Sequence, residues 1–432
     1  MKGPRLWITP SHPNWDERER TVQSRPARVL EKQVQRIVTQ IRAKGDSALI
    51  KYTSKFDKVA LPPERLRVTT GEAREAYGKV SHEEISAIKS MKQRLEIIGN
   101  EVLDRAEFQV ELDGVLVRNL LKPIESVGCY VPGGEAVYPS TMAMTVVPAK
   151  LAGVPRVVVC SPPTAEGTIN PLTLVAADIC EADEVYKVGG AQAIAALAYG
   201  TRSIKPVRKI VGPGNKYVTM AKMLVSKDVP IDMPAGPSEI LILADETADP
   251  RLIALDMISQ AEHAADSVVG LMTTSKELAE AVLTTLREIA PSMKRARIVR
   301  KALSENSFIV VCKTTDEMIQ LANEFASEHV EIMAKESEQI ADKMMTAGLV
   351  LVGRDTPVSA SDYCFGTNHV LPTSGFGYTF SGLSVLDFAR RISIVESSKE
   401  ALLQLKDVAR TLANAENLPN HYKAIEGRFS LE

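Results

Sequence analysis

The sequence lacks long hydrophobic runs and lacks an excess of charge of either sign. No apolar stretch reaches the roughly 18 residues that a transmembrane helix needs, and the N-terminus has no apolar segment typical of signal peptides. We therefore expect a cytoplasmic protein. The 432 residues carry a formal net charge of −2. This argues against a general binder of nucleic acid or anionic membranes, because both need a positive excess or patch.

Cysteine is scarce, and neither repeats nor low-complexity segments occur. The five cysteines are odd in number and scattered, mostly inside apolar runs: Cys129, Cys160, Cys180, Cys312 and Cys364. No CxxC pair is present, so the pattern predicts free thiols in a reducing compartment rather than a metal or redox pair. With 45% apolar and 25% charged residues, the chain has the composition of an ordinary folded protein of two to three domains.

The opening part of the chain follows a helical pattern. Apolar residues recur at helical spacing over residues 27–44 and again over 82–98. Gly45 is expected to end the first helix and Asp46 to cap the next one. Asp113 and Gly114, between two short apolar runs, predict a β-hairpin. This N-terminal segment, residues 1–125, carries no candidate site.

From residue 126 onward, short apolar runs alternate with helical stretches. Such alternation is typical of βαβ units around a mostly parallel sheet. The expected strands cover residues 126–131, 156–160, 184–188, 209–211, 239–243, 308–312, 330–332 and 349–352. We expect the α/β class, with two incomplete, Rossmann-like domains at 126–245 and 246–380. A C-terminal helical tail, 381–432, would follow them.

Three glycine-rich turns follow expected strands and precede helices. They are Pro132-Gly133-Gly134, Gly189-Gly190-Ala191-Gln192 and Gly212-Pro213-Gly214-Asn215. Helix N-termini beyond strand ends attract phosphate, because their free N–H groups and the helix dipole point at it. None of the turns matches GxGxxG, and turns that merely need a positive φ explain them equally well.

Histidines near carboxylates or carboxamides are the main chemical signal. Residues 357–373 form an irregular polar segment with Asp362 and His369, which predicts a functional loop. Gln260 and His263 lie three apart on an expected helix, and this pairing suits zinc, although a solvated or core histidine is the commoner case. Asp362 and His421 could complete a tetrahedral site if the fold brings them together.

Glu328 and His329 form a second kind of pair, at an expected helix-to-strand turn on the rim of a sheet. Adjacent residues in such a turn can divide proton transfer between a carboxylate and an imidazole. An exposed acid beside a capping histidine is the alternative explanation.

Motifs along almost the whole chain resemble those of histidinol dehydrogenases. The most distinctive are CYVPGG (129–134), KVGGAQAIAALAYGT (187–201), VGPGNKYV (211–218), IDMPAGPSEI (231–240), SQAEH (259–263), SEHVEIM (327–333), SDYCFGTNHVLPT (361–373) and AENLPNH (415–421). The resemblance implies a zinc- and NAD-dependent enzyme of histidine biosynthesis. Its reaction would be the oxidation of L-histidinol through L-histidinal to L-histidine.

The resemblance also implies a role for each matching position. The expected ligands of one zinc ion per subunit are Gln260, His263, Asp362 and His421. Glu328 and His329 match the acid–base pair. Substrate contacts are expected from His329, from the four zinc ligands, and from Ser238, His369 and Glu416. NAD contacts are expected from Tyr130, Gln192 and Asn215. The family is homodimeric with exchanged C-terminal tails, so Glu416 and His421 would serve the partner's site.

Two departures from the family pattern leave alternatives open. Ser327 stands where proline usually precedes the Glu-His pair, and Ser361 stands where glycine usually precedes Asp-Tyr. Neither change removes an expected ligand or proton carrier. They allow a paralogue that oxidises another polar alcohol, such as sulfopropanediol. A zinc hydrolase that uses no NAD and a non-catalytic binding protein on the same scaffold are further alternatives.

Overall fold

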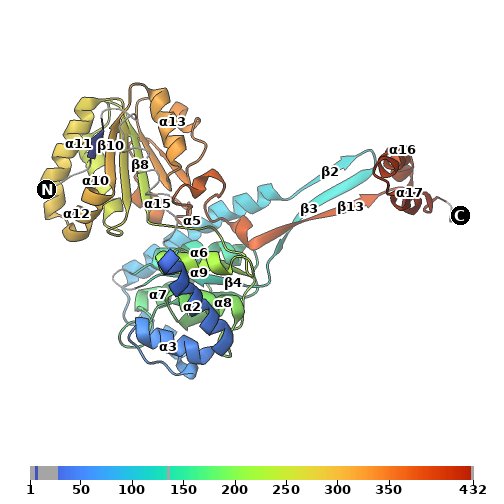
Figure 1. Ribbon diagram of the computed structural model, residues 1–432, viewed down its shortest axis with the longest axis horizontal. Helices are drawn as coiled ribbons and strands as arrows, with labels where there is room; N and C mark the ends of the chain where they lie inside the picture. The colour runs from blue at the N-terminus through green and yellow to red at the C-terminus, as the bar shows by residue number, and fades with distance from the viewer. Residues whose placement is uncertain (1–4, 8–27, 134–136, 430–432) are drawn as a thin grey trace.

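The computed structural model describes residues 5–7, 28–133 and 137–429. Two α/β domains lie one above the other in Figure 1, and a long arm projects away from both. The expected α/β fold with parallel sheets and helical extensions is confirmed. None of the helices in these ranges is both long and apolar enough to cross a lipid bilayer.

The first domain is built on a four-stranded parallel sheet in the order β6-β5-β4-β7. Its strands are β4 (Val127–Tyr130), β5 (Val157–Ser161), β6 (Glu184–Lys187) and β7 (Lys209–Val211). Helices cover both faces, and the two central strands, β4 and β5, are accordingly buried along their whole length. One face carries α2 (Arg28–Lys44), α3 (Asp46–Phe56), α8 (Gly190–Tyr199) and α9 (Lys216–Val225). The other carries α5 (His82–Ala106), α6 (Pro139–Leu151) and α7 (Pro171–Ile179).

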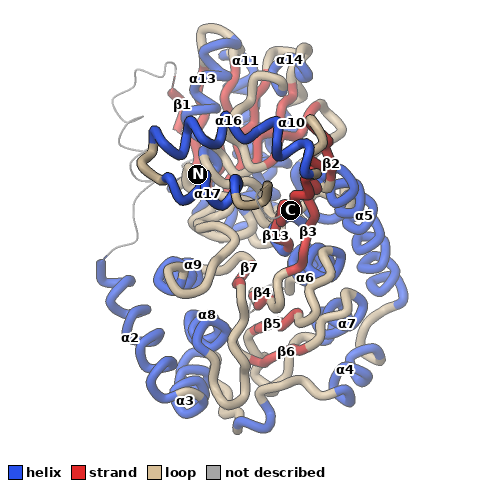
Figure 2. The backbone as a smooth tube through the Cα atoms, turned by 90° about the vertical axis from the view of Figure 1, so that its right-hand side faces the viewer, coloured by secondary structure: helices blue, strands red, loops and turns tan. Residues whose placement is uncertain are grey.

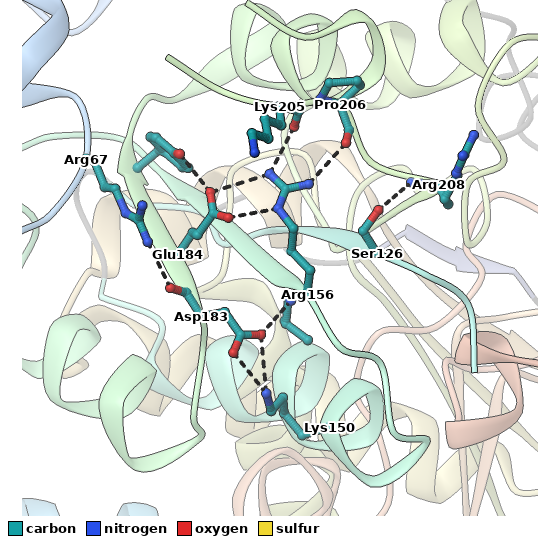
Figure 3. A network of polar contacts seen from close by, with 11 residues as sticks. Arg67, Ser126, Lys150, Arg156, Asp183, Glu184, Lys205, Pro206 and Arg208 are labelled. Atoms are coloured by element: carbon teal, nitrogen blue, oxygen red, sulfur yellow. Dashed lines mark hydrogen bonds and ion pairs between the residues drawn. The ribbon is translucent and has the colours of Figure 1, made fainter. Parts of the chain in front are cut away.

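Ion pairs and hydrogen bonds tie together the amino-terminal edge of this sheet (Figure 3). Arg156, just before β5, donates to Glu184 at 2.8 Å and to the carbonyl oxygens of Lys205 and Pro206, both at 3.1 Å. Asp183 accepts from Lys150 at 3.2 Å. This edge is therefore fixed by structural contacts, and the opposite, carboxyl-terminal edge carries the glycine turns.

The second domain has a six-stranded parallel sheet in the order β1-β10-β9-β8-β11-β12. Its strands are β1 (Arg5–Trp7), β8 (Glu239–Ala244), β9 (Val268–Thr273), β10 (Ser307–Val311), β11 (His329–Met333) and β12 (Leu349–Val352). On one face lie α10 (Pro250–Ala261), α11 (Lys276–Ile289) and α12 (Ala296–Glu305). The other face is covered by α13 (Thr315–Phe325) and α14 (Ser337–Ala341).

The arm is a three-stranded antiparallel sheet that ends in two helices (Figures 1 and 2). It consists of β2 (Phe108–Leu112), β3 (Val115–Pro123), β13 (Ala389–Ser397), α16 (Lys399–Ala415) and α17 (Pro419–Glu426). Asp113 and Gly114 both have positive φ, as the expected hairpin turn requires. Apolar side chains along the arm are exposed, among them Val395 at 60% and Leu412 at 56%.

The remaining elements are short. They are α4 (Thr70–Tyr77), α15 (Val358–Tyr363) and the 3-10 turns η1 (Pro63–Arg65), η2 (Ala290–Ser292), η3 (Phe376–Tyr378) and η4 (Val385–Phe388). Four of the five cysteines are buried, Cys364 is exposed, and all five are free thiols.

Three details differ from the sequence predictions. The division at residue 245 places β8 in the first domain, but β8 hydrogen-bonds with β9 and β11 in the six-stranded sheet. Gly45 is the N-cap of α3, so Asp46 is the first helical residue rather than the cap. The strand β13, from the region expected to be helical, completes the arm by pairing along β3.

Candidate active site

Glu328 and His329 lie at the amino-terminal rim of the six-stranded sheet, where α13 gives way to β11. Both residues are buried, at 7% and 3% exposure, which excludes the alternative of an exposed acid. His329 Nδ1 is 3.0 Å from the carbonyl oxygen of Glu239. A carbonyl only accepts, so Nδ1 carries the proton and Nε2 has a free lone pair. Among the described residues, this buried Nε2 has no hydrogen-bond partner.

Burial disfavours the charged form of both residues. It lowers the pKa of His329 to about 4, and the nearby His263 lowers it further. Burial also raises the pKa of Glu328 well above its ordinary value, with the carboxylates of Glu239 and Asp362 adding to the effect. Burial therefore disfavours an ion pair across the 3.6 Å between His329 Nδ1 and Glu328 Oε2.

Glu239, the first residue of β8, holds both side chains in place, and no pattern in the sequence indicates this position. Its N–H donates to Glu328 Oε2 at 2.7 Å, and its own carboxylate accepts from the N–H of Glu328 at 3.3 Å and of Ser374 at 3.0 Å. Burial raises the pKa of this carboxyl to about 7. In sequence Glu239 looks like an ordinary strand residue, and only the pairing of β8 with β11 reveals its position.

Three of the four expected zinc ligands come from neighbouring elements of the second domain. Gln260 lies in the last turn of α10, which packs against α15 and its Asp362. The prediction of Gln260 and His263 on one helix is wrong, because α10 ends at Ala261 and His263 lies in the following turn. The N–H of His263 donates to the Gln260 carbonyl at 3.3 Å, which keeps the two residues close. Asp362, expected in a loop, lies on the short helix α15.

The chemistry of these donors fits zinc. A carboxamide, an imidazole and a carboxylate provide the oxygen and nitrogen ligands that Zn²⁺ accepts. Burial raises the pKa of Asp362 to about 7, and no cationic side chain contributes to that shift. Within the described ranges, no group of three or more His, Cys, Asp or Glu could hold a metal. Of the three expected ligands within one chain, only His263 and Asp362 are of these residue types, and the third is Gln260. A tetrahedral zinc site would need one more ligand.

His421, the fourth expected ligand, is not near this set in the same chain. It lies exposed on α17 at the far end of the arm, and Glu416 lies exposed between α16 and α17 (Figure 1). A single chain therefore lacks two of the side chains expected at its site.

His369 joins the two domains at the site. Its Nε2 is 3.1 Å from Thr141 Oγ1 on α6 of the first domain, and its Nδ1 is 3.6 Å from Asp362 Oδ1. Burial lowers the pKa of His369 to about 4, and the nearby His329 and His263 contribute. Ser238 directly precedes Glu239 and is half-buried at the same rim. Thr141 is a further contact that the sequence analysis did not identify.

The expected NAD contacts gather at the carboxyl-terminal edge of the four-stranded sheet. The Tyr130 hydroxyl accepts from the N–H of Gly190 at 3.0 Å. Gln192 is 1% exposed, and its Oε1 has no partner among the described residues. Asn215 caps α9 by accepting from the N–H groups of Tyr217 and Val218, which leaves its side-chain N–H groups available.

The turn before Asn215 requires glycine. Gly212 has a φ of 112°, and a Cβ there would lie 2.2 Å from the carbonyl oxygen of Tyr130. Glycine is therefore required here by the backbone conformation alone. The turn also brings two expected cofactor residues, Tyr130 and Asn215, to one edge of the sheet.

Comparisons with known proteins agree with this arrangement. The model of the histidinol dehydrogenase family matches residues 20–429. Histidinol dehydrogenase of Methanosarcina mazei is 43% identical over 397 residues, covering 92% of this chain and 91% of the relative. The Methanocaldococcus jannaschii enzyme is 44% identical, covering 92% of each. The crystal structure of histidinol dehydrogenase from Elizabethkingia anophelis superposes with a TM-score of 0.92 at 36% identity, covering 99% and 98% of the two chains. The chain belongs to the histidinol dehydrogenase family.

Proposed function

We propose that the chain oxidises L-histidinol through L-histidinal to L-histidine, a step of histidine biosynthesis, with the residues assigned below. Family membership supports the reaction. The observation that carries the assignment is the buried, unpartnered Nε2 of His329, beside Glu328. Turning an alcohol into an acid removes two hydrides, and NAD supplies the redox chemistry when it is bound.

His329 takes the hydroxyl proton in the first oxidation. Its imidazole is neutral, and the hydrogen bond from Nδ1 to Glu239 fixes the ring so that Nε2 is the proton acceptor. A pKa of about 4 is low for such a base. Ionisation of Glu328, 3.6 Å away, would raise it, because a nearby negative charge favours the imidazolium.

Glu328 takes a proton from water in the second oxidation. That step adds water to the aldehyde, so a base must accept one of the water protons. The raised pKa of Glu328 makes its ionised form a stronger base than an exposed glutamate. The N–H of Glu239 holds Oε2 in place without supplying a proton to it.

Gln260, His263 and Asp362 would hold zinc, together with His421 of the partner subunit. Zinc, when bound, supplies a Lewis acid that positions the substrate. The arm is exposed and apolar and carries Glu416 and His421 away from its own domains, which supports a homodimer with exchanged tails. We expect His263→Ala to lose most of its bound zinc while the chain stays folded. Full zinc occupancy in this variant, with its circular dichroism unchanged, would contradict the ligand set.

The function is tested by following NADH absorbance with a panel of alcohols. We expect two molecules of NADH per L-histidinol and L-histidine as the product, since each hydride reduces one NAD. A sulfonated diol and simple aliphatic alcohols serve as competing substrates. A higher kcat/KM for any of these alcohols, or no NADH from L-histidinol, would overturn the proposed reaction.

A further inference from the structure

Asp57, the residue that ends α3, places a carboxylate against the turn between β6 and α8. Its Oδ2 is 3.5 Å from Gln192 Nε2. A Cβ built on Gly189 would lie 3.3 Å from its Oδ1. Among the described residues Asp57 has no salt bridge, and burial raises the pKa of its carboxyl to about 6. An uncompensated carboxylate therefore lies directly beside the expected cofactor turn.

A second acceptor beside this carboxylate lacks a hydrogen-bond donor. Gln192 Oε1 is buried with no partner among the described residues, and it would lie 2.9 Å from a Cβ on Gly190. The N–H of Gly190 is already taken by the Tyr130 hydroxyl. A phosphate would be repelled here by Asp57, whereas a group with two neighbouring hydroxyls could donate to Asp57 and to Gln192. A ribose has such a pair of hydroxyls.

The position of Asp57 identifies which ribose it would meet. α3 and α8 pack on one face of the four-stranded sheet, together with Tyr130. α6 packs on the other face, and its Thr141 contacts His369 in the catalytic site. The reactive nicotinamide must reach the side of α6, where the proton carriers lie. The half of the dinucleotide near Asp57 is then the adenosine half.

We propose that Asp57 accepts hydrogen bonds from the adenosine ribose of NAD and excludes the 2′-phosphate of NADP. An acidic side chain that accepts from the ribose 2′-hydroxyl is the usual way in which dinucleotide sites select NAD. Here the residue comes from a helix that precedes the domain's first strand. The inference rests on the proposed function, because it assumes that a dinucleotide binds at this edge.

The first test is equilibrium binding of NAD and NADP by calorimetry, with no alcohol present. The variants are Asp57→Asn, which keeps the shape, and Asp57→Ser, which also makes room for a phosphate. Glu64→Gln, an exposed acid nearby, is the matched control. We expect Asp57→Ser to weaken NAD binding about tenfold, the weight of one hydrogen bond to a charged group, and to tighten NADP binding. An unchanged ratio of the two affinities in both variants would overturn the proposal.

The second test separates the two riboses of NAD. We expect 5′-AMP to compete with NAD in the wild-type protein and 2′,5′-adenosine diphosphate to compete only in Asp57→Ser. Equal inhibition of wild type and variant by both compounds would mean that Asp57 does not face the adenosine ribose. If NAD binds but L-histidinol yields no NADH, the proposed function fails while the role of Asp57 stands. If the wild-type protein binds neither NAD nor NADP, the proposed role of Asp57 is wrong.

A kinetic measurement distinguishes selection from structural damage. Because α3 and α6 lie on opposite faces of the four-stranded sheet, Asp57→Asn should raise KM for NAD and leave kcat within about twofold, as loss of uniform binding does. The variant should unfold at the same temperature as wild type or higher, because it removes a charge that has no counter-ion. A lower kcat accompanied by a higher KM and a lower unfolding temperature would indicate a structural role and contradict the proposal.

Discussion

At the level of single residues, the backbone of Glu239 holds both proposed proton carriers. The N–H of Glu239 donates to Glu328, and its carbonyl accepts from His329. The two side chains are therefore held in a fixed relation, and we propose that they perform different tasks. Oxidation of the alcohol needs only a base at the hydroxyl, whereas oxidation of the aldehyde also needs an activated water.

We predict that Glu328→Gln slows the oxidation of L-histidinal by roughly 10²-fold or more, the usual weight of one acid–base group. The amide keeps the size and the hydrogen bond but loses the basic oxygen. Oxidation of L-histidinol should fall less, so that histidinal accumulates and can be trapped. His329→Asn should show the opposite bias. Equal losses in both half-reactions for both variants would mean that the two residues act as one unit.

The burial of Asp57 should make the stability of the chain depend on pH. Burial raises its pKa from 3.8 to about 6, so the folded chain binds this proton more tightly than the unfolded chain. Stability should therefore fall as the pH rises between these two values, and the loss should persist at higher pH. Asp57→Asn cannot titrate and should lose less stability over this interval. The measurement is the urea midpoint of both proteins from pH 4 to pH 7. A constant difference between the two curves would contradict the burial of this carboxyl.

At the level of helices and strands, the sequence predicts what is local. The strands at 209–211 and 349–352 have the predicted bounds, because a short apolar run is a local feature of the sequence. The sheet to which β8 belongs could not be predicted, since pairing is a long-range property. The spacing of Gln260 and His263 fits a helix, but α10 ends at Ala261, before His263.

The candidate site was predictable only as separate pieces. The glycine turns and the His-containing motifs are visible in the sequence, and the resemblance to a family joins them. The positions of Glu239, Thr141 and Asp57 at the site could not be predicted, because each looks like an ordinary strand, helix or helix-end residue. Their positions follow from contacts between segments that are distant in sequence, such as the bond between Thr141 and His369.

A buried ion pair holds the turn at Gly212. Lys222 on α9 and Asp232 are both buried and paired. The Lys222 ammonium donates to the carbonyl of Gly212 at 2.9 Å, and the Asp232 carboxylate accepts from the N–H of Gly212 at 2.7 Å. The two charged side chains therefore hold the backbone N–H and C=O of the same residue and fix the turn that leads to Asn215.

We predict that Lys222→Met destabilises the chain by about 3–5 kcal/mol, because it leaves the carboxylate of Asp232 buried without its partner. Adding Asp232→Asn should recover part of this loss, since the unpaired charge is then gone. Chemical unfolding of both single variants and of the double variant measures the coupling. Effects that simply add would show that the pair does not act as a unit.

At the level of the whole molecule, we propose that the arm makes each site depend on a second chain. His421 and Glu416 lie at its exposed end, away from the buried Glu328 and His329 of the same chain. In a dimer with exchanged tails, each site would combine the domains of one chain with the tail of the other.

Mixing two inactive variants tests this exchange. We predict that His421→Ala mixed with His329→Ala regenerates activity, because one site of each mixed dimer carries both lesions and the other carries none. With equal amounts and random pairing in a twofold-symmetric dimer, about a quarter of the sites should be intact. Mass spectrometry of differently labelled chains verifies that the subunits exchange. No recovery despite verified exchange would place the tail in its own chain's site.

The pairing within the arm also orders events during synthesis of the chain. The hairpin of β2 and β3 is complete once Pro123 has left the ribosome, whereas its third strand begins only at Ala389. Throughout the interval, β3 presents an unpaired edge to the solvent or to neighbouring nascent chains. Exposed strand edges are templates for aggregation. Slow translation of the segment between these strands should therefore lower the yield of folded protein, and a chaperone that covers strand edges should restore it.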